Sequence, residues 1–184
     1  SPQSTLVGIL RFESLDRPVV LETDAALIDL TELAGNLLGV DIIDLTASGS
    51  SVIRVSPGSI AGLSSSGTIR LDLGSEDRVL TQGGWRYHSG RHDAGQAVHR
   101  FTATGAVLDV HSQNPWQNPL NRLDVDGDGT VSPLDVLALI NTINSGGVTA
   151  GLPAYDPTSE QRFYFLDVLG DRGLGPLDVL HVIN

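Results

Sequence analysis

Short apolar stretches alternate with turn residues over the first part of the chain. The segment TIRLDL shows the pattern most clearly, because Ile69, Leu71 and Leu73 share one face of an extended strand and Arg70 and Asp72 share the other. Similar runs rich in Val, Ile, Leu and Thr recur between Gly, Ser and Asp, as is typical of an all-β domain. The strand candidates are STLVGILRF, RPVVLET, AALIDLT, VDIIDLT, SVIRVS, GTIRLDL, DRVLTQ, WRYHS, AVHRFTAT and AVLDVHS. The pattern predicts a mainly β domain over residues 1–114, of the sandwich or β-roll-like kind.

Four local patterns refine this prediction. Residues 30–38 favour a helix, and SPGSIAGL favours a turn or a single helical turn. The segment HSGRHDAG favours an exposed hairpin loop. The tetrapeptide IDLT occurs at residues 28–31 and again at 43–46, which indicates stacked similar strands.

The pattern changes to a helical period after PWQNPLN, whose two prolines favour an extended joint. We expect Trp116 in this joint to pack between the β domain and the first helix that follows. A domain over residues 115–184 then divides into motif one (123–144), a Gly/Pro/Ser-rich linker (145–162) and motif two (166–184). Its helix faces hold more apolar residues than a two-helix core needs, so either the β domain or another molecule must cover the rest. These residues are Leu134, Val136, Leu137, Leu139, Ile140 and Ile143, then Leu177, Val179, Leu180, Val182 and Ile183.

Motif one opens with LDVDGDGTVSPLD, in which aspartates occupy every second position. Two carboxylates about 4 Å apart at an effective dielectric of about 20 repel by roughly 4 kcal/mol, so a cation must offset the cost. The spacing matches the calcium loop of an EF-hand. We expect Gly129 to make the sharp turn at the sixth position. The expected ligands, in loop order, are Asp124, Asp126, Asp128, the carbonyl of Thr130, Ser132 and, from the helix that follows, Asp135.

Motif two repeats motif one, with PLDVL intact. Its candidate metal residues are Asp167, Asp171, Gly173 and Asp178. Leu169 replaces the second aspartate and Arg172 replaces the glycine, so we expect this site to be weak or empty, with Arg172 supplying part of the missing positive charge.

The paired loop-helix segments, each ending in LDVLxxIN, resemble the type I dockerin domain, as found at the C-terminus of large secreted or cell-surface bacterial proteins. The resemblance implies a helical domain with two EF-hand-type loop-helix motifs, bound Ca²⁺ and a cohesin as protein partner. It also implies a hydroxyl-rich pair that reads the cohesin at the tenth and eleventh loop positions. This chain has Pro133 and Leu134, then Pro176 and Leu177, at those positions. The cohesin partner is therefore less firmly implied than the fold.

The β-rich part resembles the modules of very large repetitive bacterial adhesins and surface proteins. The segments that carry this resemblance are VDIIDLTASGSSVIRVSPGSIAGL, TIRLDLGSEDRVLTQGGW and the closing GAVLDV. It implies a structural or adhesive scaffold without catalytic residues.

Composition excludes several kinds of chemistry. The chain has no Cys, and all 11 basic residues are arginine, so disulfides, thiolate sites and lysine Schiff bases are absent. A net charge of −11 disfavours nucleic acid and anionic membrane surfaces as partners. No apolar run reaches the roughly 20 residues that span a bilayer. Together with the calcium module, this favours a secreted or cell-surface protein, since millimolar extracellular calcium fills weak loops.

These observations predict a non-enzymatic, extracellular calcium-binding assembly module. Its partner would be other copies of itself, in a fibre or surface layer, or a cohesin-like receptor. One alternative is the C-terminal anchor of a larger secreted enzyme or adhesin. Another is carbohydrate binding by the β domain, for which Trp85, Tyr87 and Phe101 are the available aromatics. A weaker alternative is a transition-metal site made by clustered histidines, namely His88, His92, His99 and His111.

Overall fold

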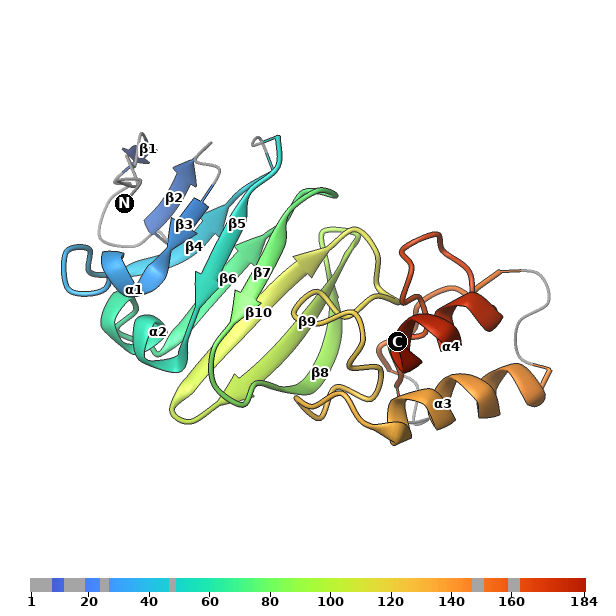
Figure 1. Ribbon diagram of the computed structural model, residues 1–184. Coiled ribbons are helices and arrows are strands. Elements are labelled where there is room, and N and C mark those ends of the chain that lie inside the picture. Colours follow the sequence, from blue (N-terminus) through green and yellow to red (C-terminus); the bar gives the residue numbers. More distant parts are fainter. Residues whose placement is uncertain (1–7, 12–18, 24–26, 47–48, 147–150, 159–162) are drawn as a thin grey trace.

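The structure of this chain is a computed structural model that describes residues 8–11, 19–23, 27–46, 49–146, 151–158 and 163–184. It has a mainly β N-terminal part and a smaller C-terminal part with two helices, placed side by side (Figure 1). None of the described helices is long and apolar enough to cross a membrane.

The described residues of the β part form two sheets, and every strand candidate from the sequence contributes a strand. The large sheet, in spatial order, contains β1 (Gly8–Arg11), β2 (Val19–Thr23), β4 (Val40–Asp44), β6 (Thr68–Asp72), β10 (Ala106–Ser112), β9 (Gln96–Ala103) and β8 (Arg86–Asp93). The small sheet contains β3 (Leu27–Asp29), β5 (Val52–Val55) and β7 (Arg78–Thr81).

Successive strands alternate between the two sheets. The pairs β2–β3, β4–β5 and β6–β7 each place one strand in the large sheet and the next in the small sheet. Neighbouring strands of this series are parallel in both sheets, and β10 adds a fourth parallel strand beside β6. The chain therefore winds in stacked turns, which fits the β-roll-like expectation better than a sandwich of antiparallel strands. Antiparallel β9 and β8 then close the large sheet.

Two short helices return the chain from the small sheet to the large one. Helix α1 (Leu30–Leu33) follows β3, and α2 (Pro57–Leu63) follows β5. The start of α2 has proline in its first turn and a reciprocal capping box between Ser56 and Ser59, which satisfies N–H groups that a helix start leaves unpaired. The helix expected over residues 30–38 is thus shorter than predicted, and SPGSIAGL forms a longer helix than a single turn.

Two other local expectations need correction. The segment HSGRHDAG belongs to a largely exposed hairpin, as expected, but it is mostly strand and not loop, because β8 continues to Asp93 and the turn occupies Ala94 and Gly95. The IDLT repeats do not stack on each other, because they lie in different sheets. Their similarity is local: Asp29 accepts hydrogen bonds from the N–H and hydroxyl of Thr31, and Asp44 does the same for Thr46. IDLT is a strand end followed by a side-chain-capped turn.

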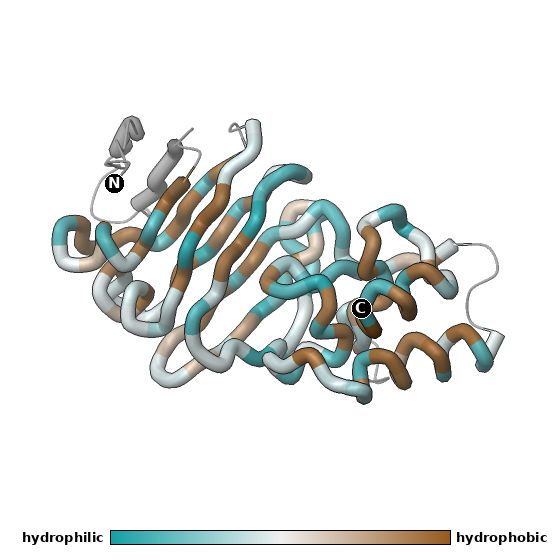
Figure 2. The backbone as a smooth tube through the Cα atoms, viewed as in Figure 1, coloured by the Kyte–Doolittle hydropathy of each residue, from teal (hydrophilic) through white to brown (hydrophobic). Residues whose placement is uncertain are grey.

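Buried apolar side chains from both sheets form one core, and hydrophobic positions recur along the strands of the β part (Figure 2). Completely buried members come from both sheets and from α2. Ile43, Ile69, Leu71 and Leu108 come from the large sheet, Ile28 and Ile53 from the small sheet, and Ile60 from α2.

The C-terminal part has its own small core beneath α3 (Pro133–Asn144) and α4 (Pro176–Ile183). Leu139 and Val182 are buried there with Val125 and Val168 of the preceding loops. Five of the eleven residues of the predicted apolar faces stay exposed, and the described residues of the β part do not cover them. The exposed members are Leu134, Leu137, Leu177, Leu180 and Ile183.

An aromatic cluster joins the two parts of the molecule. Phe165, which follows the linker, belongs to the core of the β part, where its ring lies 5.2 Å from that of Tyr87 and 5.1 Å from that of His99. Tyr155 of the linker contacts His92 and His99 of the β8–β9 hairpin. The linker thus packs against the β part instead of only connecting the two motifs.

Trp116 lies at the same boundary. Its ring stacks on Phe163 at 5.3 Å, and its Nε1–H donates to the carbonyl of Pro153 at 3.0 Å. As expected, Trp116 packs against the small core that includes Leu139 of α3, and its described ring contacts are with Phe163 and Tyr155 of the chain that leads into motif two.

Candidate metal centre

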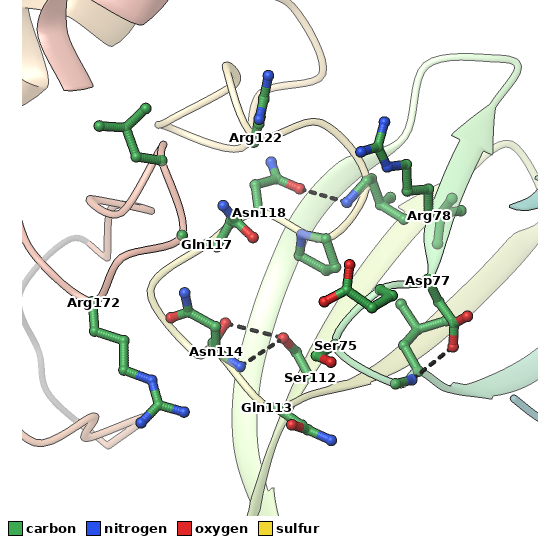
Figure 3. A pocket seen from close by; sticks show the side chains of 18 of the residues that line it. Ser75, Asp77, Arg78, Ser112, Gln113, Asn114, Gln117, Asn118, Arg122 and Arg172 are labelled. Carbon is green, nitrogen blue, oxygen red and sulfur yellow. Dashed lines mark hydrogen bonds between the residues drawn. The ribbon is translucent and has the colours of Figure 1, made fainter. Parts of the chain in front are cut away.

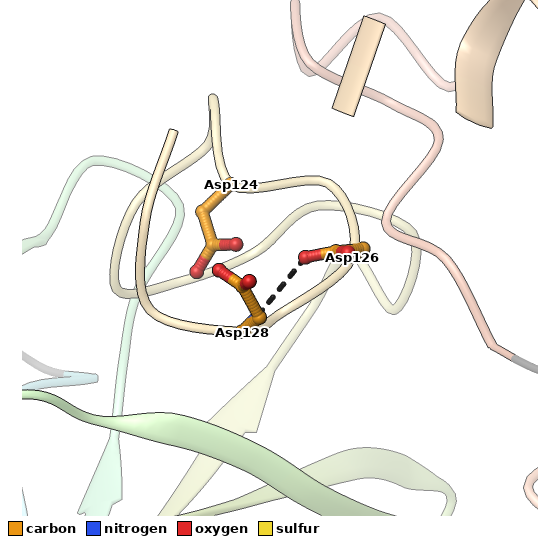
Figure 4. Close-up of side chains that lie close together, drawn as sticks. All are labelled: Asp124, Asp126 and Asp128. Atoms are coloured by element: carbon orange, nitrogen blue, oxygen red, sulfur yellow. Dashed lines mark hydrogen bonds between the residues drawn. The ribbon is translucent and has the colours of Figure 1, made fainter. Parts of the chain in front are cut away.

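The first loop (residues 124–135) gathers three carboxylates, as its spacing predicts. Oxygen atoms of Asp124, Asp126 and Asp128 all lie within 4.8 Å of one another (Figure 4). Left-handed backbone at Gly127 (φ 69°) and Gly129 (φ 91°) makes the tight curl, which glycine adopts without steric cost. Asp126 Oδ1 accepts the N–H of Asp128 at 3.1 Å, and Asp128 Oδ1 accepts the N–H of Thr130 at 2.9 Å. These bonds turn the side chains toward the centre of the loop.

Burial and mutual repulsion disfavour the charged form of Asp124. Burial is the larger cause and the carboxylates of Asp135, Asp126 and Asp128 add to it, so that the pKa of Asp124 rises to about 6. Asp124 Oδ2 accepts the N–H of Gly129 at 3.1 Å, whereas Oδ1 is buried and has no hydrogen-bond partner among the described residues. A buried, unsatisfied carboxylate oxygen beside two further carboxylates fits a hard divalent cation with oxygen ligands, such as Ca²⁺.

Asp135 is completely buried and holds the loop against α3. Its Oδ1 accepts the N–H groups of Val125 (2.7 Å) and Asp126 (3.1 Å), and its Oδ2 accepts that of Ser132 (2.7 Å). It lies outside the cluster of three described above. Ser132 is the N-cap of α3 and accepts the N–H of Leu134 through its hydroxyl. Metal ligation by Asp135, Ser132 and the Thr130 carbonyl therefore stays a prediction, and the structure adds a folding role for the first two.

The second loop (residues 167–178) repeats these backbone bonds position by position. Asp178 Oδ1 accepts the N–H groups of Val168 and Leu169, as Asp135 does for the matching residues of the first loop. Asp178 Oδ2 accepts the N–H of Gly175, and Asp167 Oδ2 accepts that of Arg172. The sequence repeat is thus also a repeat of loop geometry.

The two loops differ at their first aspartate. Asp167 is fully buried, and both of its oxygens are occupied. Oδ1 accepts the N–H groups of Gly170 (2.7 Å) and Asp171 (3.0 Å), while Oδ2 accepts that of Arg172 (2.8 Å) and the amide of Asn114 (2.6 Å). Four donors stabilise this carboxylate without a cation, which supports the expectation of a weak second site.

Arg172 does not act as we expected. It stabilises Asp167 through its backbone N–H, whereas its side chain lines a pocket next to the β part. Asp171 Oδ1 accepts the N–H of Gly173 at 2.9 Å, so both residues form a turn. Sequence reasoning missed two asparagines in and next to the joint. Asn118 donates to the carbonyl of Asp124 in the first loop at 2.8 Å, and Asn114 donates to Asp167 in the second loop.

Residues 117–184 match the family model of the dockerin type I domain. Comparisons with curated proteins and with solved structures gave no match. The family match spans both loops and both helices, and dockerin domains bind Ca²⁺ and dock to cohesin proteins. The C-terminal part is accordingly called the dockerin domain below.

The first loop of the dockerin domain packs directly against the β part. The N–H of Tyr87 donates to the carbonyl of Gly127 at 2.7 Å. A Cβ on Gly127 would stand 2.6 Å from Cβ of Tyr87, and one on Gly129 would stand 2.5 Å from the carbonyl oxygen of Trp85. Both glycines are therefore required by close approach as well as by their backbone conformation.

Two alternative sites in the β part are not supported. His99 faces the aromatic cluster, whereas His111 lies near Asp72 and Asp93, and no described group of histidines brings its ligand atoms together as a metal site requires. For carbohydrate stacking, Trp85 and Phe101 are buried and offer no exposed ring.

Proposed function

We propose that this protein is an extracellular docking module in which calcium stabilises the dockerin domain and an exposed apolar helix face binds a protein partner. The role is non-catalytic and places the β part, as a structural or adhesive scaffold, in a larger assembly. Calcium binding and an exposed apolar helix face would equally suit the C-terminal anchor of a larger secreted enzyme or adhesin. The family match to a domain that docks to cohesins supports the docking role.

The exposed apolar face of α3 and α4 is the observation that carries this proposal. Leu134 and Leu177, at matching positions of the two motifs, expose 59% and 65% of their surface. A groove of about 350 Å³ lies between the helices, with Ile140, Val179 and Leu180 among its lining residues. We call the exposed side chains of this region the helix face: Leu134, Leu137, Leu177, Leu180 and Ile183. Contiguous exposed apolar side chains of this kind mark protein interaction sites.

The helix face is also almost free of charge. The only carboxylates within α3 and α4, Asp135 and Asp178, are buried beneath it, and His181 is the only other titratable side chain of the two helices. In a chain of net charge −11, this face can meet an apolar partner, or a second copy, without electrostatic repulsion.

Calcium would act through folding in this proposal. Asp124, Asp126 and Asp128 would hold the ion, which offsets their repulsion and leaves Asp135 to tie the loop to α3. Binding to the folded loop stabilises the folded state by mass action. The second loop already satisfies Asp167 with protein donors, so its helix can be held without a tightly bound ion.

The experiment that tests the proposal is size-exclusion chromatography with light scattering, in millimolar calcium and in excess EGTA, alone and with a type I cohesin domain. Calcium-dependent binding of the cohesin identifies a receptor-docking module. Calcium-dependent oligomers of the chain alone identify self-assembly through the helix face. A monomer that ignores both cohesin and calcium would contradict the proposed function.

A further inference from the structure

The small sheet stops one strand before the large sheet does. In the large sheet the parallel series continues from β6 to β10, but no described strand pairs with β7 on its outer side. After β10 the chain continues into residues 113–122, which face β7 across a pocket of about 500 Å³. Within the described residues, no hydrogen bond joins this segment to β7. The place where the next strand of the stack would lie is therefore a pocket.

The outer edge of β7 presents backbone groups to this space. Arg78 and Gln82 donate their N–H groups to Ser51 and Val55 on the β5 side. Since backbone groups alternate in direction along a strand, those of Val79 point to the opposite side. An unpaired edge of this kind is a template for another strand.

Three arginines stand around the same pocket. Arg78 lies on β7, Arg122 directly follows the joint and Arg172 belongs to the second loop (Figure 3). None of the three forms an ion pair with a described residue. Glu76 and Asp77 also line the pocket, but Asp77 accepts the N–H groups of Ser51 and Gly74. The pocket therefore holds three arginines against two carboxylates, a local excess of positive charge in a strongly acidic molecule.

The backbone of Arg172 points to a role for its side chain. Arg172 has φ 64°, in the left-handed region, at the loop position where the first loop has Gly129 with φ 91°. Only Ala94 shares a positive φ among the other described non-glycine residues. Glycine would remove this strain at no cost to the hydrogen bond that the Arg172 N–H makes, so the strained arginine indicates a functional use of the guanidinium.

We propose that this pocket binds an extended acidic peptide segment, which adds as the missing strand to the edge of β7 while its carboxylates pair with Arg78, Arg122 and Arg172. Its volume lies within the range of about 300–1,000 Å³ that is usual for ligand sites. Backbone pairing supplies affinity and the arginines select charge. This site is separate from the helix face and does not depend on the proposed docking function.

The test is fluorescence anisotropy with a labelled peptide of alternating valine and glutamate, at constant calcium. We expect saturable binding that weakens with salt, and binding at least about tenfold weaker when lysine or glutamine replaces glutamate. Two further peptides carry N-methyl groups on every second backbone amide, one on each edge of the extended chain. Only the peptide methylated on the edge that pairs with β7 should lose binding. Equal binding of the acid, lysine and glutamine peptides, or indifference to both methylation patterns, would overturn the proposal.

Variants locate the site. Arg122→Gln and Arg172→Gly should each weaken the acidic peptide about fivefold. The matched control is Arg86→Gln, since Arg86 also forms no ion pair with a described residue but lies on β8 outside the pocket. If Arg86→Gln weakens peptide binding as much as Arg122→Gln does, the peptide binds through the net charge of the protein alone, and the proposed site is refuted. If Arg122→Gln still binds cohesin or self-associates while it binds the acidic peptide less tightly, the pocket and the helix face are two different binding sites.

Discussion

At the residue scale, the two calcium-type loops differ in how their first aspartate is satisfied. Asp124 has an unpartnered buried oxygen among the described residues, whereas Asp167 accepts four hydrogen bonds. The two aspartates occupy the same loop position, and the sequence distinguishes their loops only through Leu169 and Arg172. It does not show which donors satisfy Asp167. The difference comes from Asn114, which is far away in sequence, and from the backbone of the second loop. Long-range donors of this kind cannot be read from motif spacing.

The first prediction concerns these two aspartates. Asp124→Asn should weaken calcium binding by at least about tenfold, because it removes a charged ligand from the first site. Asp167→Asn is the matched control, since it should leave the tighter calcium site unchanged. It should destabilise the fold, because the amide of Asn cannot accept all the hydrogen bonds that the Asp167 carboxylate accepts. Calorimetric titration of the stripped protein measures the affinity. Equal losses of calcium affinity in the two variants would contradict the assignment of the tight site.

The second prediction concerns the backbone of Arg172. Arg172→Gly should raise the free energy of unfolding by roughly 0.5–1 kcal/mol, because glycine adopts φ 64° without a Cβ clash and its greater chain entropy offsets part of the gain. Arg172→Ala keeps the Cβ and should give no such gain. Urea unfolding at fixed calcium compares the three proteins. Stabilisation by alanine equal to that by glycine would show that charge, and not backbone strain, is responsible.

At the element scale, the sequence predicted where strands lie but not which strands pair. Alternation within TIRLDL identifies a strand from local information, and all the strand candidates are confirmed. The assignment of successive strands to two sheets depends on contacts between distant residues, and a period of two contains no information about them. The IDLT repeat shows the limit: the same four residues end a strand in both sheets because Asp caps the following turn.

The third prediction concerns the helix face. Leu137→Ser and Leu180→Ser together should weaken binding to a cohesin, or to a second copy, by about tenfold or more, since truncation of central apolar contacts dominates interface energy. Leu38→Ser is the matched control, because Leu38 is 77% exposed but lies in the β part. All three substitutions should change stability little, as the side chains are exposed. Light scattering at several concentrations measures association, and an equal effect of Leu38→Ser would exclude the helix face.

At the scale of the whole molecule, the β part and the dockerin domain share a buried boundary. The domain boundary expected near residue 115 follows the change in sequence pattern, yet Phe165, which directly precedes motif two, packs in the core of the β part. The aromatic residues Tyr155, Phe163 and Phe165 were visible in the sequence, but their partners on β8 and β9 were not. The structure thus predicts that substitutions or ion binding in one part alter the stability of the other part.

The fourth prediction uses the buried histidine of this boundary. Burial lowers the pKa of His99 to about 4 from an ordinary value of 6.5. Because the unfolded chain takes up a proton that folded His99 excludes, stability is full above about pH 6.5 and falls as the pH approaches 4, by roughly 3 kcal/mol. Asp124, whose pKa is raised, contributes a change of opposite sign.

The difference in the free energy of unfolding between the wild type and His99→Gln isolates the contribution of His99, since both proteins share Asp124. Urea unfolding at several pH values should show that the difference in stability shrinks between pH 6.5 and 4. A difference that stays constant over this range would mean that His99 becomes protonated in the folded state without penalty.

The fifth prediction concerns communication between calcium and the β part. Tyr87 of β8 donates its N–H to Gly127 inside the first loop, so ordering of that loop should protect the edge strand of the large sheet. Removal of calcium with EGTA should speed hydrogen exchange in peptides covering residues 85–93, while peptides covering residues 40–55 should be unaffected. Asp124→Asn should show the fast exchange even in calcium. Uniform acceleration over both regions would instead indicate global destabilisation, and unchanged exchange in residues 85–93 would show that the loop and β8 are independent.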